Sequence, residues 1–255
     1  MPEVTGAGPP PPEPVTAGAA RAVPRPLLTA AWRDLAFLHW PVRPAAAARL
    51  LPPGTRPDVF GGDSYVGLIA FRMHRVGWLG LPGLPYLGSF PETNVRLYSV
   101  GPDGRRGVAF LSLDAARLLP VLAGRAGFRL PYQWSAMRVR RDGDVISYAS
   151  QRRWPGPRAR LRLAVRVGGP LASPSELDRF LTARWGLHAA WYDGRLRYLP
   201  NEHPPWTLRR ATLLRLEESL IGAAGLPAPS GGPVSVLFAP GVPVRMGVPK
   251  RTIPK

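Results

Sequence analysis

The fold is decided by residues 90–98, which read FPETNVRLY and place charged groups inside a run otherwise typical of a buried strand. A Gly-rich turn follows, and residues 107–114 form a second strand-like run, so the sequence predicts a β-hairpin. Glu92 and Arg96 lie four residues apart, and a strand puts both side chains on one face. An unpaired buried charge costs several kcal/mol. We therefore expect Glu92 and Arg96 either to face a cavity or to pair with each other.

Strand-like runs and tight turns continue on both sides of this hairpin. Further strands are expected at residues 31–41, 63–72, 134–141, 145–152, 158–167, 189–192, 195–199, 206–216, 234–238 and 242–246, with short helices at 44–51, 115–126, 173–185 and 217–224. Asp142-Gly143 is the strongest hairpin turn signal, and Asp114 is expected to cap the helix that follows it. Together these patterns predict a mainly β (α+β) fold of antiparallel strands with a few short helices.

Proline and glycine narrow the fold class and the domain limits. The chain has 255 residues, of which 33 are Pro and 28 are Gly, and this favours short strands and many turns over a helical bundle. Residues 1–26 hold almost no large apolar residue, so we expect a disordered tail there. A single domain is expected over residues 27–250, followed by a C-terminal tail at 251–255.

Composition also bears on cofactors and location. The chain has no Cys, which excludes disulfides and thiolate metal sites. Its four His residues lack the close spacing of a metal site, so we expect neither a metal nor another cofactor. No apolar run is long enough to span a bilayer, and the N-terminus lacks a secretory signal. These features predict a cytoplasmic protein without a membrane partner.

The charge is strongly positive, at +18, and the positive residues are almost all Arg. Within the expected strand at 158–167, Arg158, Arg160, Arg162 and Arg166 share one face, and Arg152 and Arg153 precede the strand. Such a face is typical of the solvated side of an antiparallel strand. The alternative is a platform that binds nucleic acid or another anionic partner. We favour the solvated face, because the other arginines are scattered without a recognisable binding motif.

Residues 77–88 form a loop of Gly, Pro, Leu and aromatic residues. A loop this apolar is unfavourable in free contact with water. We therefore interpret it as a lid or a rim over an apolar space.

Several motifs occur in an order that resembles a known family. They are His39-Trp40-Pro41, residues 58–62, Pro91–Tyr98, Phe110–Asp114, Leu130-Pro131-Tyr132, Tyr198 and His203–Trp206. Across most of residues 31–248 this set resembles the YqjF-like family of uncharacterised bacterial proteins, also called domain of unknown function 2071. That family is similar in fold to acetoacetate decarboxylase. The resemblance implies a closed or nearly closed antiparallel β-barrel with flanking helices and an internal cavity.

The resemblance also has chemical implications. Acetoacetate decarboxylases carry a Schiff-base Lys after a Gly-aromatic-Pro turn, and a Glu and an Arg lie in their cavity. In this chain Tyr132 stands where that Lys would be, and the two Lys, Lys250 and Lys255, lie at the end of the chain. Schiff-base decarboxylation is therefore not expected. The resemblance implies that Glu92 matches the cavity Glu and Arg125 the cavity Arg.

Six residues form the candidate site. Glu92 and Tyr132 are the candidates for catalysis, and the candidates for ligand binding are Arg96, Arg125, Tyr98 and His203. In this interpretation an Arg binds a carboxylate in bidentate fashion and Glu92 acts as an acid or a base. The alternatives are that Glu92 and Arg96 form an internal salt bridge and that Tyr132 is a core aromatic residue.

The leading functional hypothesis is a soluble β-barrel that binds a small molecule. It acts on a carboxylate or carbonyl compound without Schiff-base chemistry, and the sequence leaves open whether it is an enzyme. One alternative is an Arg-rich binding module for nucleic acid or another anionic partner. The other alternative is a structural or interaction protein with no ligand. The oligomeric state also stays open.

Overall fold

The computed structural model describes residue 8 and residues 10–252, and this part of the chain is mainly β. Its strands are β1 Leu28–Val42, β2 Arg56–Pro57, β3 Ser64–Trp78, β4 Phe90–Val100, β5 Arg106–Ala115, β6 Tyr132–Asp142, β7 Val145–Trp154, β8 Arg160–Pro170, β9 Gly186–Ala190, β10 Leu196–Glu202, β11 Arg209–Glu218, β12 Ser235–Met246 and β13 Lys250–Arg251. Its helices are α1 Pro44–Ala48, α2 Leu118–Phe128, α3 Glu176–Thr182 and α4 Leu220–Ala223. The mainly β class predicted from the sequence is confirmed.

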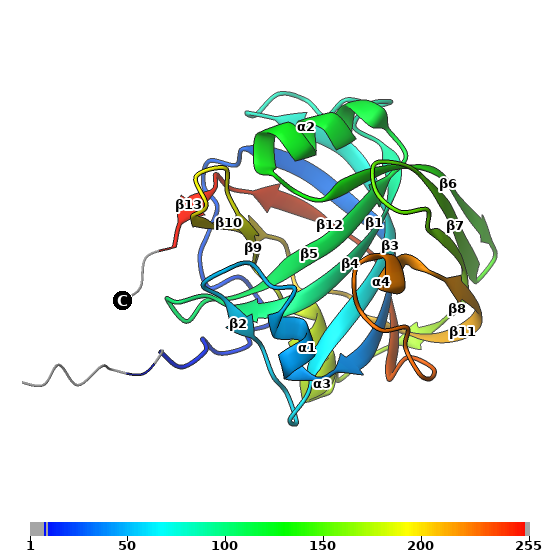
Figure 1. The fold of residues 1–255 in the computed structure, drawn as a ribbon. Helices are drawn as coiled ribbons and strands as arrows, with labels where there is room; N and C mark the ends of the chain where they lie inside the picture. Colours follow the sequence, from blue (N-terminus) through cyan, green and yellow to red (C-terminus); the bar gives the residue numbers. More distant parts are fainter. Residues whose placement is uncertain (1–7, 9, 253–255) are drawn as a thin grey trace, which may run out of the picture.

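Nine strands close into a barrel. β4 pairs with both β3 and β5, and the ring continues through β6, β7, β8, β11, β12 and β1 back to β3. β10 also pairs with β12, so that β9 and β10 form a second connection between β5 and β12. Figure 1 shows α2 across one end of the barrel and α1 and α3 at the other.

The barrel is mixed, which corrects the expectation of a purely antiparallel one. β5 runs parallel to β6 and to β9, whereas its pairing with β4 is antiparallel. Neighbouring parallel strands need a crossover connection, because the chain must return to the end at which it started. Helix α2 forms part of this crossover between β5 and β6.

The central strands β1, β3 and β4 are buried on both faces. Val95 and Leu97 of β4 pack with Leu68 of β3 and Leu163 of β8 in a cluster that fills the nine-strand ring. The alternate residues of the same strands point the other way, as Phe71 does, toward a second cluster and a cavity. A strand with two covered faces is expected to be apolar on both. Polar residues on the cavity face of β4 therefore stand out.

The expectation of a disordered N-terminal tail is wrong for residues 10–26. The Glu13 amide donates to the Gly104 carbonyl at 2.9 Å, and its carboxylate accepts from the Arg106 amide at 3.1 Å. Val23 is buried, and its amide donates to Glu202 Oε2 at 2.6 Å. Polar contacts hold this segment although it has few large apolar residues. The parts of the expected tails at residues 1–7, 9 and 253–255 lie outside the described residues.

Three local predictions also change. The two strands expected at 234–238 and 242–246 are the single strand β12, because its pairing with β1 continues without interruption through Ala239 and Gly241. Helix α3 is shorter than expected and begins after Ser175, whose side chain and that of Asp178 cap each other's backbone amides. β13 pairs with β10 at residues 250–251, across the predicted end of the domain.

Asp114 is not a helix cap, since it lies within β5 and α2 begins four residues later. Its side chain is fully buried and accepts hydrogen bonds from Arg152 Nε at 2.9 Å, Arg152 Nη2 at 2.7 Å and Ser135 Oγ at 2.7 Å. Arg152 is therefore a buried partner of Asp114 and not part of the exposed arginine face. This bidentate pair joins β5 to β6 and β7 inside the barrel wall.

We predict that Asp114→Ala lowers the free energy of unfolding by about 3–5 kcal/mol, because it leaves the Arg152 guanidinium buried without its carboxylate. Urea denaturation monitored by circular dichroism measures this change. Asp144→Ala is the matched control, since Asp144 and Arg166 form an ion pair of 3.5 Å with both side chains more than half exposed. The control is expected to shift stability by no more than about 0.5 kcal/mol. Equal losses in the two variants would contradict the buried pair.

Candidate functional site

A cavity of about 530 Å³ lies against the face of β1, β3 and β4 that points away from the packed ring. Its wall is mainly apolar and includes the large side chains of Trp32, Phe37, Phe71, Met73 and Trp206. Helix α2 and the loop after β3 line the cavity on one side, which confirms the rim expected from the sequence of residues 77–88. The size and the apolar wall are typical of a site for a small molecule.

Strand β4 brings three polar residues to this wall. Glu92, Asn94 and Arg96 occupy alternate positions of β4 and all line the cavity. Their side chains point to one face because a strand has a side-chain period of two. The hairpin predicted from residues 90–114 therefore places Glu92 and Arg96 at a cavity. This was one of the two expectations for these residues, the other being that they pair with each other.

Glu92 is paired with Tyr132, whose hydroxyl donates to Glu92 Oε2 at 3.2 Å. Burial raises the pKa of Glu92 to about 8, the hydrogen bond from Tyr132 opposes this change, and the negative charge of Asp114 adds to it. Glu92 is thus mainly a neutral carboxylic acid at pH 7. Burial, followed by the neighbouring Glu92, raises the pKa of Tyr132 well above its usual value.

Helix α2 holds Tyr132 in place from behind. A Cβ atom added to Gly124 would lie only 2.3 Å from Tyr132 Cδ2, so the ring packs directly on the helix backbone. Arg125 Nη1 donates to the Tyr132 carbonyl at 2.8 Å, and its guanidinium lies 5.7 Å from the centre of the Trp154 ring. Arg125 does not line the cavity. The structure therefore does not bring Arg125 to the cavity with the other candidate residues, because the cavity side of α2 is formed by other residues.

Arg96 has its guanidinium in the cavity wall, and its Nη2 atom donates to Leu181 O at 3.0 Å and to Tyr98 Oη at 3.2 Å. Among the described residues no ion pair joins Arg96 to a carboxylate. The alternative of an internal Glu92–Arg96 salt bridge is therefore wrong. Arg96 is a half-buried cation whose partners in this part of the chain are neutral oxygens.

Tyr98 does not line the cavity, and the structure places it behind Arg96, with which it forms a hydrogen bond. Its hydroxyl lies 2.7 Å from His39 Nε2 and 2.7 Å from Leu181 O. A hydroxyl carries one hydrogen. If it donates to Leu181 O, it accepts from Arg96 and from His39 Nε2. Burial, and then the charges of Arg96 and Arg184, hold the pKa of His39 well below its usual value, so His39 is neutral.

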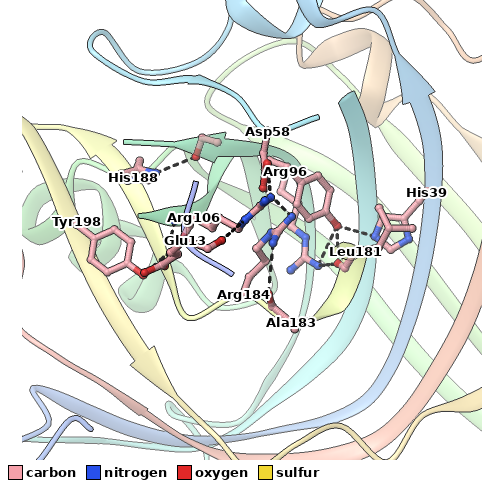
Figure 2. A network of polar contacts seen from close by, with 12 residues as sticks. Glu13, His39, Asp58, Arg96, Arg106, Leu181, Ala183, Arg184, His188 and Tyr198 are labelled. Carbon is pink, nitrogen blue, oxygen red and sulfur yellow. Dashed lines mark hydrogen bonds and ion pairs between the residues drawn. The ribbon is translucent and has the colours of Figure 1, made fainter. Parts of the chain in front are cut away.

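Arg184 is a second cavity arginine, which the sequence analysis missed. Its Nη2 atom lies 3.0 Å from Asp58 Oδ2 without hydrogen-bond alignment, and Asp58 also pairs with Arg106. Figure 2 shows Asp58 beside these guanidinium groups, and Glu13 of the N-terminal segment beside Arg106. Burial lowers the pKa of Arg184 to about 10, so it still carries its charge at pH 7.

His203 lines the cavity and lies between two tryptophans, with ring centroids 4.4 Å from Trp206 and 4.5 Å from Trp185. Its Nδ1 atom lies 2.7 Å from the Pro204 carbonyl, which makes Nδ1 the protonated nitrogen and leaves Nε2 as an acceptor. Burial lowers the pKa of His203 to about 4, so the ring is neutral. The structure thus places the predicted residue His203 at the cavity.

Two other predictions concern metals and the arginine face. Within the described residues, no group of three His, Cys, Asp or Glu side chains is arranged to hold a metal ion.

Arg160, Arg162 and Arg166 of β8 point outward and are exposed, as expected for a solvated face. Among the helices that the structure describes, none is long and apolar enough to cross a membrane.

Solved structures with a similar arrangement of strands identify the fold. The acetoacetate decarboxylase of Legionella pneumophila superimposes with a TM-score of 0.58 at 13% identity, over 91% of this chain and 90% of that chain. The enduracididine biosynthesis enzyme MppR, complexed with pyruvate, gives a TM-score of 0.58 at 17% identity, over 92% of this chain and 93% of that chain. The chain therefore has the acetoacetate decarboxylase-like fold.

Sequence comparison gives the family. The model of the family described as an uncharacterized conserved protein, DUF2071, matches residues 29–243. The uncharacterized protein YqjF of Bacillus subtilis is 33% identical over 205 residues, which cover 80% of this chain and 84% of that protein. The chain belongs to the DUF2071 family, as the ordered motifs indicated.

We predict that Glu92 makes the stability of the protein pH-dependent. The pKa of Glu92 is raised from 4.5 to about 8, so between these values the folded state holds a proton that the unfolded state has released. The contribution of Glu92 to the free energy of unfolding is complete below about pH 4.5 and is lost as the pH rises through about 8. At about 1.4 kcal/mol per pKa unit, this loss amounts to several kcal/mol.

Urea denaturation at about pH 5 and about pH 8.5 measures this loss. Glu92→Gln is the matched variant, since it keeps the shape and an oxygen that accepts from Tyr132 but does not titrate. The wild type is expected to lose more stability than the variant over this range. The buried histidines titrate in both proteins, so the difference isolates Glu92. The same pH dependence in both proteins would contradict a buried neutral Glu92.

Proposed function

We propose that the cavity binds an organic acid with a mainly apolar body and that Arg96 binds its carboxylate. The observation that carries this proposal is the charge of Arg96, which has no carboxylate partner in the described part of the chain. Its Nη2 atom is bound to neutral oxygens, and Nη1 makes no hydrogen bond within the described residues. A guanidinium binds a carboxylate through charge-assisted hydrogen bonds, and these are the stronger kind.

Arg184 adds to the positive potential at the same wall. Asp58 is its carboxylate neighbour, but Asp58 is shared with Arg106, so one negative charge serves two cations. Neutral His39 and His203 add no charge of either sign. The polar side of the cavity is therefore cationic, and an anionic ligand fits it better than a neutral or cationic one.

Glu92 and Tyr132 are suited to a second oxygen of the same ligand. Glu92 and Arg96 lie four residues apart on β4, so their Cα atoms are about 13 Å apart along an extended strand. A neutral carboxylic acid donates a hydrogen bond, so Glu92 interacts favourably with a carbonyl or hydroxyl oxygen of the ligand. With a pKa of about 8, Glu92 is also able to give up or take a proton near neutral pH. We infer an oxo acid or hydroxy acid as the preferred class.

The fold relatives support the ligand class without supporting Schiff-base chemistry. A structure of MppR with the same fold is a complex with pyruvate, which is a small oxo acid. The present chain has Tyr132 at the position implied for the Schiff-base Lys, and its two Lys are at positions 250 and 255. A reaction in this cavity therefore does not pass through a lysine adduct at this position.

The two alternative functions fit the geometry less well. Next to the exposed arginines of β8 lie acidic residues, since Glu217 faces Arg162 across the strand pair and Asp144 pairs with Arg166. These carboxylates weaken a phosphate-binding platform. A structural module without a ligand needs no open space lined by polar side chains. A cavity of about 530 Å³ with polar side chains in its wall disfavours that alternative.

A ligand panel tests the proposal. Thermal unfolding is followed with oxo acids, hydroxy acids, fatty acids and nucleotides, and binding is then measured by calorimetry. At about 100 times its dissociation constant, a ligand adds roughly 2.7 kcal/mol to the stability of the folded state. We expect an organic acid to give this shift. Arg96→Gln is expected to weaken binding about ten- to a hundredfold, because a charge-assisted hydrogen bond is lost.

Arg166→Gln is the matched control. It removes an exposed arginine of β8 that does not line the cavity, and it is expected to leave affinity unchanged. Glu92→Ala, which removes the hydrogen-bond donor, is expected to weaken the binding of oxo and hydroxy acids more than that of simple fatty acids. If organic acids bind equally to wild type and Arg96→Gln, Arg96 is not the carboxylate site and the proposal fails.

A further inference from the structure

The mouth of the cavity carries the largest group of exposed apolar residues in the described part of the chain. They lie in the loop after β3 and on α2, and comprise Trp78, Leu79, Leu81, Leu84, Tyr86, Leu87, Leu118, Leu119 and Leu122. We call this set the apolar rim. Leu79 is 66% exposed and Tyr86 68% exposed, so these side chains are solvated in the free protein. Exposed apolar clusters of this kind mark sites of interaction with a protein, a ligand or a membrane.

The loop and α2 form one continuous surface. The Arg117 guanidinium, at the start of α2, lies 4.2 Å from the centre of the Tyr86 ring. At the other end of the helix, the Trp78 and Phe128 ring centroids are 6.1 Å apart. The loop therefore runs beside the helix along its length, and both lie at one end of the barrel (Figure 1). Leu81 and Leu119 are exposed and also line the cavity, so the cavity opens within this surface.

The charged residues within the two segments that carry the apolar rim all have one sign. Residues 74–91 and 115–131 contain no Asp or Glu, and they contain four arginines, Arg75, Arg117, Arg125 and Arg129. Arg75 and Arg129 are exposed. An exposed apolar surface edged by arginines, with Trp and Tyr among its residues, has the composition of surfaces that bind in the interface of a bilayer.

We propose that the apolar rim docks the protein on the surface of a bilayer that contains anionic lipids, with the cavity mouth facing the lipid. Apolar side chains enter the boundary between headgroups and acyl chains, and the arginines contact anionic headgroups. A second copy of this chain fits the surface less well. A twofold contact brings the same patch of both copies together, so it would place the arginines of one rim against those of the other. The docking is independent of which ligand the cavity takes.

Vesicle co-sedimentation tests this proposal on the full chain. The probe is a vesicle of roughly equal parts phosphatidylglycerol and phosphatidylcholine, at roughly physiological ionic strength, where distant charges are screened. The test variant is Leu79→Gln/Leu118→Gln/Leu122→Gln, which keeps the net charge and changes residues that do not line the cavity. We expect its vesicle affinity to fall about tenfold or more, because apolar burial is lost.

A charge control separates docking from general attraction of a cationic protein. Arg160→Gln/Arg162→Gln/Arg166→Gln removes three charges from the exposed face of β8, away from the rim, and is expected to keep most of the vesicle affinity. A thermal unfolding curve of the glutamine rim variant that matches that of the wild type would show that the variant is folded. Equal vesicle binding by the wild type and the rim variant would overturn the proposal, as would a stronger loss in the β8 variant. A wild-type dimer that the rim variant abolishes would instead assign the surface to self-association.

Discussion

The structure depends on the burial of strand β4 on both of its faces. On one face Val95 and Leu97 complete the packed interior of the ring, where any polar atom would lack a partner. On the other face the strand borders a cavity, so Glu92, Asn94 and Arg96 are tolerated there. A slip of one residue in the register of β4 would exchange these two sets and place the charges in the packed ring. The burial of β4 therefore fixes both the register of the barrel and the location of the polar groups.

Burial sorts the titratable groups of the site by charge. A carboxylic acid or an imidazole escapes the cost of desolvation by taking its neutral form, and Glu92, His39 and His203 all have pKa values shifted in that direction. An arginine stays charged when it is buried. Arg96 and Arg184 therefore keep their charge while Glu92, His39 and His203 lose theirs. The positive potential of the cavity follows from this difference between residue types and not from the number of basic residues in the chain.

The sequence predicted the strands well because their information is local. The alternation of residues 63–72 and the turn Asp142-Gly143 specify β3 and the β6–β7 hairpin through contacts within a few residues. Glu92, Arg96 and His203 were found because charged or unusual residues interrupt apolar strands and loops. Asp114 and Arg184 were misread or missed, since their roles depend on Arg152 and Asp58, which are far away in the chain. Composition likewise misjudged residues 10–26, where long-range polar contacts replace apolar burial.

The order of groups along β4 links the site to the mouth of the cavity. The exposed loop leads directly into β4, so Glu92 lies near the mouth end of the strand and Arg96 lies about 13 Å further along it. Under the proposed function, an organic acid on its way to Arg96 would therefore pass Glu92. An ionised Glu92 would repel the incoming carboxylate in this apolar surrounding, whereas the neutral acid offers it a hydrogen bond. Under the proposed function, the raised pKa of Glu92 would therefore favour the entry of an anion, and it is also a consequence of burial. A ligand carboxylate bound at Arg96 would supply the negative charge that the described residues do not place beside that arginine.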